Sequence, residues 1–445
     1  MHSIQEGVDQ RAAAAPMRHF HESFMQNNNG STAIHTFLCI FFTVQCSLLC
    51  AIRNNNGVNQ YIYEYIVIVV PMIVLHTVLV EHVIALNLVA FVFLFGKILI
   101  NYDHNNIKQL YTGNRSTRIH SITCLRALTY LITGLCILAV DFQDFPRHLA
   151  KTETFGYSLM DTGVGLFVLM SGLVHKYSYD NYLEMFKHNF KFVSILLILG
   201  ISRYVSIKQL DYHEHVSEYG VHWNFFFTLA LCKFLSTILL LVFQNSLLLC
   251  IFVITIHEYL LYIGLQDWVF SDTKRIDIID ANREGIASSL GYISLYLFAA
   301  HLKTEINKND ISKHLILRKI VLYSIFLIGG SYLFNYFRPT SRTLANAGYC
   351  FYLSTLLTSI LSIIYFIEII SSNSKSAIFQ VPKILEDINH NGLIYFLISN
   401  LTTGLLNMLF QTLLTSSLST FIILNVYMTF NIVVICYFKR KKIKL

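Results

Sequence analysis

The 445-residue chain contains 54% hydrophobic but only 13% charged residues, whereas soluble chains average about 25% charged residues. A soluble protein of this composition would lack the polar surface to cover its apolar side chains, so an ordinary soluble enzyme is excluded. The net charge of +7 does not favour nucleic-acid binding, because the basic residues are scattered and form no basic stripe or recognition helix. We therefore expect an integral membrane protein whose partner is the lipid bilayer, with no nucleic-acid partner.

The apolar residues fall into blocks close to the roughly 20 residues that an upright spanning helix requires. Before them, residues 1–33 form a polar tail without the order of a signal peptide, which we expect to be disordered and lumenal. We predict an all-α, polytopic fold with a single transmembrane domain over residues 34–437 and a basic cytosolic tail over 438–445. The thirteen predicted spans lie near residues 34–52, 61–80, 83–100, 121–140, 157–173, 190–207, 224–243, 247–265, 286–301, 318–337, 345–370, 392–415 and 417–437.

The distribution of lysine and arginine predicts the orientation of these spans, because cytosolic loops carry the excess of both residues. One set of loops, including the C-terminal tail, carries 19 lysines and arginines, and the opposite set, including the N-terminal tail, carries 10. We therefore expect the C-terminus in the cytosol and the N-terminus in the lumen.

The cysteines and histidines do not indicate a metal site. None of the nine cysteines belongs to a CxxC pair, and His213, His215 and His222 form no HxxxH or HExxH pattern. We expect free, buried cysteines, no metal ion and no bound cofactor.

Potential acids, bases and phosphate ligands gather in the loops assigned to the lumenal side. Ionisable groups at membrane depth favour a functional interpretation over a structural one. The candidate residues of these loops are Asp141, Arg147, Lys151, Glu153, Asp161, His213, His215, Glu218, His222, Trp223, Asn224, Asn282, Arg283, Glu284 and Arg342.

The same loops carry a resemblance to a known family. Residues 141–165 read DFQDFPRHLAKTETFGYSLMDTGVG, residues 211–231 read DYHEHVSEYGVHWNFFFTLAL, and residues 281–297 read ANREGIASSLGYISLYL. Together with SRTLAN at 341–346 and NLTTGLLN at 400–407, these segments resemble the glucosaminyl-phosphatidylinositol inositol acyltransferases, also called GPI-anchored wall transfer proteins. The resemblance implies an endoplasmic-reticulum enzyme that moves a fatty acyl group, expected to be palmitoyl, from acyl-CoA to the inositol of glucosaminyl-phosphatidylinositol during GPI-anchor biosynthesis.

The resemblance also implies that Asp141 and Lys151 carry catalysis. A hydroxyl needs a general base as it attacks a thioester, and Asp141 is the predicted base, with one of His213, His215 and His222 as the alternative. Lys151 either holds Asp141 in place or stabilises the carbonyl oxygen; a structural ion pair is the alternative. One straight helix would separate Asp141 and Lys151 by about 15 Å, so we expect a folded loop broken at Pro146.

The sequence alone leaves the roles of three arginines and one aspartate open. Arg147, Arg283 and Arg342 suit phosphate groups because a guanidinium matches phosphate oxygens, but each is equally consistent with an interface anchor. A role in the site and a structural role are equally consistent with Asp161.

Three ionisable residues fall near the middle of predicted spans. Lys233, His257 and Glu258 are expected to line a path for acyl-CoA, or else to form a buried Lys–Glu pair between helices.

Two other classes of protein compete with an inositol acyltransferase. A transporter also has many spans with intramembrane charges, but it often shows repeated halves and broken helices meeting at the midplane, and the sequence shows neither. A structural membrane subunit would not need converging acids and bases. An O-acyltransferase of another family would need an intramembrane histidine, which would have to be His257 or His76. The residues around these two histidines do not support such a site.

Overall fold

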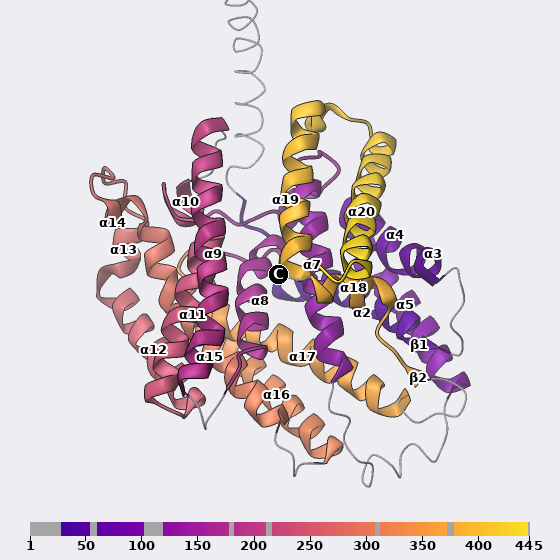
Figure 1. The fold of residues 1–445 in the computed structure, drawn as a ribbon, viewed down its shortest axis with the longest axis horizontal. Coiled ribbons are helices and arrows are strands. Elements are labelled where there is room, and N and C mark those ends of the chain that lie inside the picture. The colour runs from indigo at the N-terminus through magenta and orange to yellow at the C-terminus, as the bar shows by residue number, and fades with distance from the viewer. Residues whose placement is uncertain are drawn as a thin grey trace, which may run out of the picture.

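Twelve helices in the described part of the chain are long and apolar enough to cross a membrane. The computed structural model describes residues 28–53, 60–101, 119–177, 182–210, 216–307, 312–371 and 378–443. The thirteenth predicted span is the shorter helix α8 (Leu159–Leu173). The prediction of an all-α, polytopic protein with about thirteen spans is therefore confirmed (Figure 1).

The remaining spans each correspond to one predicted apolar block. They are α2 (Ala33–Ala51), α3–η1–α4 (Gln60–Glu64, Tyr65–Val69, Val70–Thr77), η2–α5 (Val80–His82, Val83–Ile100), α7 (His120–Ala139), α9 (Tyr182–Leu210), α11 (Phe225–Val242), α12–η4–α13 (Ser246–Leu260, Leu261–Leu265, Gln266–Val269), α15 (Arg283–Asn307), α16 (Lys313–Phe337), α17 (Ala347–Ser371), α19 (Gly392–Leu409) and α20 (Ser417–Arg440).

Burial separates the spans into an inner and an outer group. An 18-residue stretch of α15 is 83% buried and one of α7 is 72% buried, whereas the corresponding stretches of α16 and α5 are only 17% and 22% buried. The outer helices expose large apolar side chains, such as Phe93 on α5 and Phe326 on α16, at 66% and 70%. Side chains of this kind suit contact with lipid chains, as a bilayer-embedded bundle requires.

The short helix α8 belongs to the inner group. Its fifteen residues span only about 22 Å at 1.5 Å per residue, less than the roughly 30 Å of bilayer hydrocarbon. A Cβ atom at Gly165 would lie 2.0 Å from the side chain of Leu353 and 3.1 Å from that of Tyr349, so α8 packs closely on α17. Twelve of its fifteen residues are buried, and a helix surrounded by protein along its sides need not match the thickness of the bilayer.

Two buried glutamates cap helices at one end of the bundle. Glu64, 0% exposed, accepts hydrogen bonds from the backbone N–H groups of Lys383 and Ile384, each at 2.9 Å, at the start of α18 (Lys383–His390). Glu368 similarly accepts from the backbone N–H groups of His120 and Ser121, at 3.0 and 2.8 Å, at the start of α7. Carboxylates suit these positions because helix N-termini carry unpaired N–H groups and partial positive charge. The apolar blocks of the sequence gave no indication of α18.

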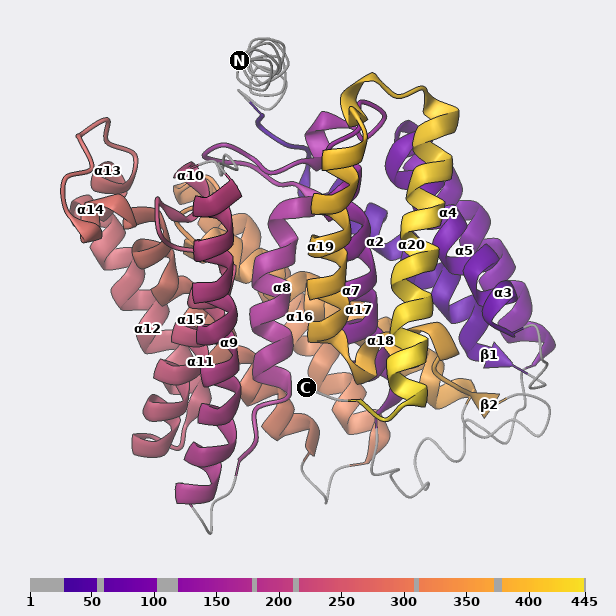
Figure 2. The ribbon, with the colours of Figure 1, turned by 45° about the horizontal axis from the view of Figure 1, so that its top comes forward.

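The connections between spans lie on two opposite faces (Figure 2). One face carries residues 28–32, the loops 140–158, 270–282, 338–346 and 410–416, and α10 (Val216–Tyr219) with the turn after it. We call it the motif face. The other, the basic face, carries the lower ends of α8 and α15, the strands β1 (Ile52–Arg53) and β2 (Ile378–Phe379), which pair antiparallel, and the end of α20. The two sets of loops separated by their lysine and arginine content therefore lie at opposite ends of the bundle.

Candidate active site

The loop between α7 and α8, residues 140–158, turns away from the α7 axis. Pro146 has φ −62° and ψ 127° and is followed by a single turn, η3 (Arg147–Leu149); a proline at this position cannot continue a helix. The side chains of Phe142 and Phe145 are 0% and 1% exposed, so the loop is anchored by apolar groups inserted into the bundle. The folded loop that the sequence analysis required is present.

The N-terminal segment holds this loop. The Asn28 side-chain amide donates to the carbonyl oxygens of Arg147 at 2.9 Å, Ala150 at 3.0 Å and Lys151 at 3.0 Å. Residues 28–32, grouped with the polar tail in the sequence analysis, thus help to shape the loop. The disorder expected of residues 1–27 lies outside the described residues.

Asp141 lies at the start of the loop and faces the end of α19. The side-chain amide of Asn407 donates a hydrogen bond of 2.8 Å to Asp141 Oδ2, and the Asp141 side chain is half-buried. A few residues further on, Asp144 Oδ1 accepts a 2.7 Å hydrogen bond from the Ser417 hydroxyl at the start of α20. The first part of the loop is therefore positioned by α19 and α20.

Lys151 at the other end of the loop forms an ion pair with Glu218 of α10. The Lys151 Nζ to Glu218 Oε1 distance is 2.6 Å, and the two side chains are 32% and 25% exposed. Burial alone would raise the pKa of Glu218, but the Lys151 ammonium and the Arg342 guanidinium outweigh it and hold that pKa at about 2. Glu218 is therefore ionised at neutral pH, and Lys151 has a carboxylate partner other than Asp141.

A second ion pair is buried beneath the loop. Arg342 Nε donates to Asp161 Oδ1 at 2.8 Å, and both side chains are 4% exposed. The other carboxylate oxygen of Asp161 accepts from the Thr152 backbone N–H at 3.1 Å and from the Thr152 hydroxyl at 2.7 Å. Asp161 also lies in the first turn of α8, whose N-cap is Ser158. This environment favours a structural role for Asp161.

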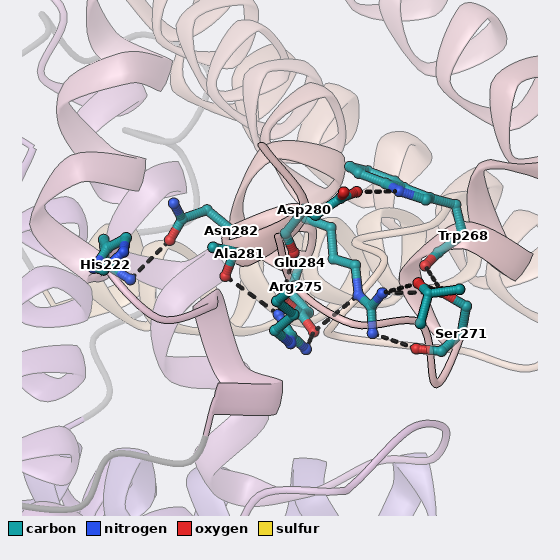
Figure 3. Close-up of polar contacts among 10 residues, drawn as sticks. His222, Trp268, Ser271, Arg275, Asp280, Ala281, Asn282 and Glu284 are labelled. Carbon is teal, nitrogen blue, oxygen red and sulfur yellow. Dashed lines mark hydrogen bonds and ion pairs between the residues drawn. The ribbon is translucent and has the colours of Figure 1, made fainter. Parts of the chain in front are cut away.

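A polar network fixes the connection between α13 and α15 (Figure 3). Arg275 contacts Glu284 at 2.5 Å. Arg283 donates to the Ser271 hydroxyl at 2.9 Å and to the Ser271 carbonyl oxygen. Both Arg283 and Glu284, predicted to bind substrate, are thus engaged within the protein and hold this loop.

Residues around α10 and the start of α11 also hold backbone. Asn282 Oδ1 accepts from the His222 backbone N–H at 2.8 Å (Figure 3), and Trp223 Nε1 donates to the Thr228 hydroxyl at 2.9 Å. Asn224 is the N-cap of α11, a role typical of asparagine. The His222 side chain is exposed on the motif face.

Four further predicted residues remain to be considered. Glu153 is exposed on the loop, and Arg147 is half-buried beside the N-terminal segment. His213 and His215 lie outside the described residues.

The chain matches a known protein family. The family model GWT1 matches residues 17–438. The chain belongs to the GWT1 family.

The relatives in this family align along most of their length. The chain is 30% identical to human glucosaminyl-phosphatidylinositol-acyltransferase PIGW, over 95% of this chain and 98% of the human protein. It is 33% identical to GPI-anchored wall transfer protein 1 of Schizosaccharomyces pombe, over 94% and 95% of the two chains. An uncharacterized Arabidopsis thaliana protein, At4g17910, is 35% identical over 82% and 83%. The resemblance stated from the motifs is therefore confirmed.

In this GWT1 family member, the three ionisable residues assigned to an acyl-CoA path fall into two separate groups. His257 Nε2 lies 2.8 Å from the Leu344 carbonyl oxygen, and Glu258 pairs with Arg338 at 3.0 Å, both beside the 338–346 loop of the motif face. Lys233 instead donates to the Tyr296 hydroxyl at 3.3 Å. The alternative of a buried Lys233–Glu258 pair is wrong, because Glu258 forms its ion pair with Arg338 at the end of α16.

The structure adds residues that the sequence analysis did not place in the site. Asn407, near the end of α19, is one of them, because its side-chain amide donates to Asp141. The signal was present, since Asn407 ends the segment NLTTGLLN that carries part of the resemblance. Thr152 is a further such residue, and a single threonine in a loop gave no signal for its contact with Asp161.

Proposed function

We propose that this chain transfers a fatty acyl group, palmitoyl, from acyl-CoA to the inositol hydroxyl of glucosaminyl-phosphatidylinositol in the endoplasmic-reticulum membrane. The observation that carries this proposal is the family match over residues 17–438, with a human relative named as the glucosaminyl-phosphatidylinositol acyltransferase. The multi-pass fold supports it, because both proposed substrates carry acyl chains that partition into a bilayer. The gathering of the motif segments on one face supports a single reaction centre there.

In the proposed reaction, Asp141 acts as the general base. Its carboxylate takes the proton of the inositol hydroxyl as the hydroxyl oxygen attacks the thioester carbonyl carbon. The tetrahedral intermediate then expels the CoA thiolate, which receives the proton from Asp141, leaving an inositol ester and free CoA. The Asn407 amide, which donates to one Asp141 oxygen at 2.8 Å, would fix the direction in which the carboxylate points.

Lys151 is proposed to stabilise the negative charge that develops on the carbonyl oxygen. Its ion pair with Glu218 supports this role over that of holding Asp141, since Glu218 fixes the ammonium on the motif face. The ammonium has three donor hydrogens, so one partner leaves donors for the reacting oxygen.

Arg147 is the arginine that best suits the phosphate of the acceptor lipid. Arg283 and Arg342 are engaged by the 271–273 loop and by Asp161. Arg147 Nε and Arg283 Nε are both buried without a hydrogen-bond partner, but the terminal nitrogens of Arg283 are already held by Ser271 and Thr273. A phosphate oxygen would satisfy the Arg147 donor.

Purified chain in lipid nanodiscs, supplied with glucosaminyl-phosphatidylinositol and palmitoyl-CoA, is expected to yield a lipid heavier by one palmitoyl group, detected by mass spectrometry. Reactions without palmitoyl-CoA or with heat-inactivated protein should give no product. The human relative serves as the positive control. Product from the human protein and none from this chain would refute the proposed function.

The proposed orientation places the motif face in the lumen and the basic face in the cytosol, in keeping with the lysine and arginine distribution. Lys274→Cys on the motif face and Lys441→Cys on the basic face are both at exposed positions. In sealed microsomes, a membrane-impermeant thiol reagent is expected to label Lys441→Cys at once and Lys274→Cys only after permeabilisation. Unmodified chain measures labelling of the native cysteines, and the reverse pattern would invert the orientation.

A further inference from the structure

A cluster of basic and aromatic side chains is buried near the basic face, away from the motif face. Lys233 of α11 and Tyr296 of α15 are 5% and 0% exposed, and His175, in the connection after α8, is 0% exposed. Lys303 of α15, which is half-buried, donates to the His175 carbonyl oxygen. These four residues, here called the lysine cluster, come from three separate parts of the chain.

Hydrogen bonding within the cluster leaves a buried donor without a partner. Lys233 can only donate, so the Tyr296 oxygen accepts from it at 3.3 Å. The Tyr296 O–H is then directed to His175 Nδ1, 2.8 Å away, which assigns the ring proton of a neutral His175 to Nε2. Burial, with the nearby Lys233 and Lys303 ammonium groups, lowers the pKa of His175 to about 3, so the ring is neutral at pH 7. His175 Nε2 has no hydrogen-bond partner.

The lysine cluster also lacks a neutralising acid. Within the described ranges, neither of its ammonium groups forms an ion pair; the nearby Glu184 pairs with Lys176 at 3.4 Å, and Glu305 pairs with Lys319 at 2.7 Å. Lys233 is instead packed against aromatic rings, with its Nζ 5.5 Å from the centre of the Phe192 ring. A buried cation without a counter-charge is costly in a membrane protein unless a ligand or water compensates it.

The surroundings of the cluster are also basic. Lys176 directly follows His175 in the chain, and Lys187, His188 and Lys191 are exposed on the first turns of α9. These groups would attract an anion arriving at the basic face.

We propose that the lysine cluster is an anion site that binds a phosphate group, with Lys233, Lys303 and His175 Nε2 as donors. Phosphate is the chemistry that fits, because two ammonium groups and a neutral N–H donor can satisfy several oxygens of one doubly charged group. Such a phosphate could belong to the CoA part of an acyl donor or to a phospholipid head group. The site lies on the face opposite Asp141, and its existence does not depend on acyl transfer taking place.

Binding to the full-length chain in nanodiscs tests this proposal without requiring turnover. With CoA as the probe and neutral phosphatidylcholine as the lipid, Lys233→Met is expected to weaken CoA binding about tenfold or more, the loss typical of one charge-assisted contact. Lys303→Met should act in the same direction and provides a second variant if Lys233→Met folds poorly. Lys97→Met, which removes a half-buried lysine of α5 that donates to the Leu49 carbonyl oxygen, is the matched control and should leave CoA binding unchanged.

The second arm uses nanodiscs that contain phosphatidic acid. If the phosphate comes from a phospholipid, CoA binding will not respond to Lys233→Met, but native mass spectrometry will show phosphatidic acid retained by the unmodified chain and lost from the variant. If Lys233→Met weakens the binding of CoA or the retention of phosphatidic acid, the site is supported, even if the chain fails to acylate inositol. If neither ligand responds to Lys233→Met or Lys303→Met, the cluster is a structural contact and the inference is wrong.

Discussion

Asp141→Asn is expected to lower the rate of inositol acylation by about 10²–10⁴-fold, the usual contribution of a general base. The amide is nearly the same size as the carboxylate, and its oxygen can still accept the hydrogen bond from Asn407. The variant should therefore fold and bind lipid while lacking a group that can take the hydroxyl proton. The measurement is the initial rate of acylated-lipid formation by the purified variant.

Asp144→Asn is the matched control for this experiment. It lies in the same loop, accepts a comparable hydrogen bond from Ser417, and should keep most of the activity. Near-normal acylation by Asp141→Asn would contradict its role as base and move the assignment to His213, His215 or His222. His222 would be tested first, because its side chain is exposed on the motif face.

Arg342→Met is expected to lower the free energy of unfolding by about 3–5 kcal/mol, the cost of leaving one partner of a buried ion pair without the other. Asp161 and Arg342 are each 4% exposed, so the stranded carboxylate would have little water to replace the guanidinium. Thermal unfolding of the detergent-solubilised chain measures the effect as a lower melting temperature.

Two comparisons separate this ion pair from a general effect of losing a charge. Asp161→Asn combined with Arg342→Met should lose less stability than the sum of the two single changes, because neither charge is then stranded. Lys176→Met removes one partner of an exposed pair and should change stability by at most about 1 kcal/mol. If Arg342→Met unfolds like the unmodified chain but binds the acceptor lipid more weakly, the phosphate role of Arg342 becomes the correct one.

The sequence by itself determined the class of the protein, the number and order of its spans, and its family. These properties depend on local features: a block of apolar residues favours the bilayer whatever its neighbours are, and the motif segments are contiguous. The eight-residue helix α18 escaped prediction because it is too short and too polar to form such a block. Its start depends on the capping carboxylate of Glu64, more than 300 residues earlier in the chain.

The tertiary structure decided which polar groups meet. Lys151 and Glu218 are 67 residues apart, and Asp141 and Asn407 are 266 residues apart, so no local pattern links either pair. The lysine cluster could not be predicted from the sequence for the same reason. The depth of Lys233 in its span suggested only a path shared with Glu258. Hydrogen bonds and ion pairs form only at contact distance, and that distance is set by how the helices pack. Hydropathy places a side chain in the membrane, but packing selects its partner.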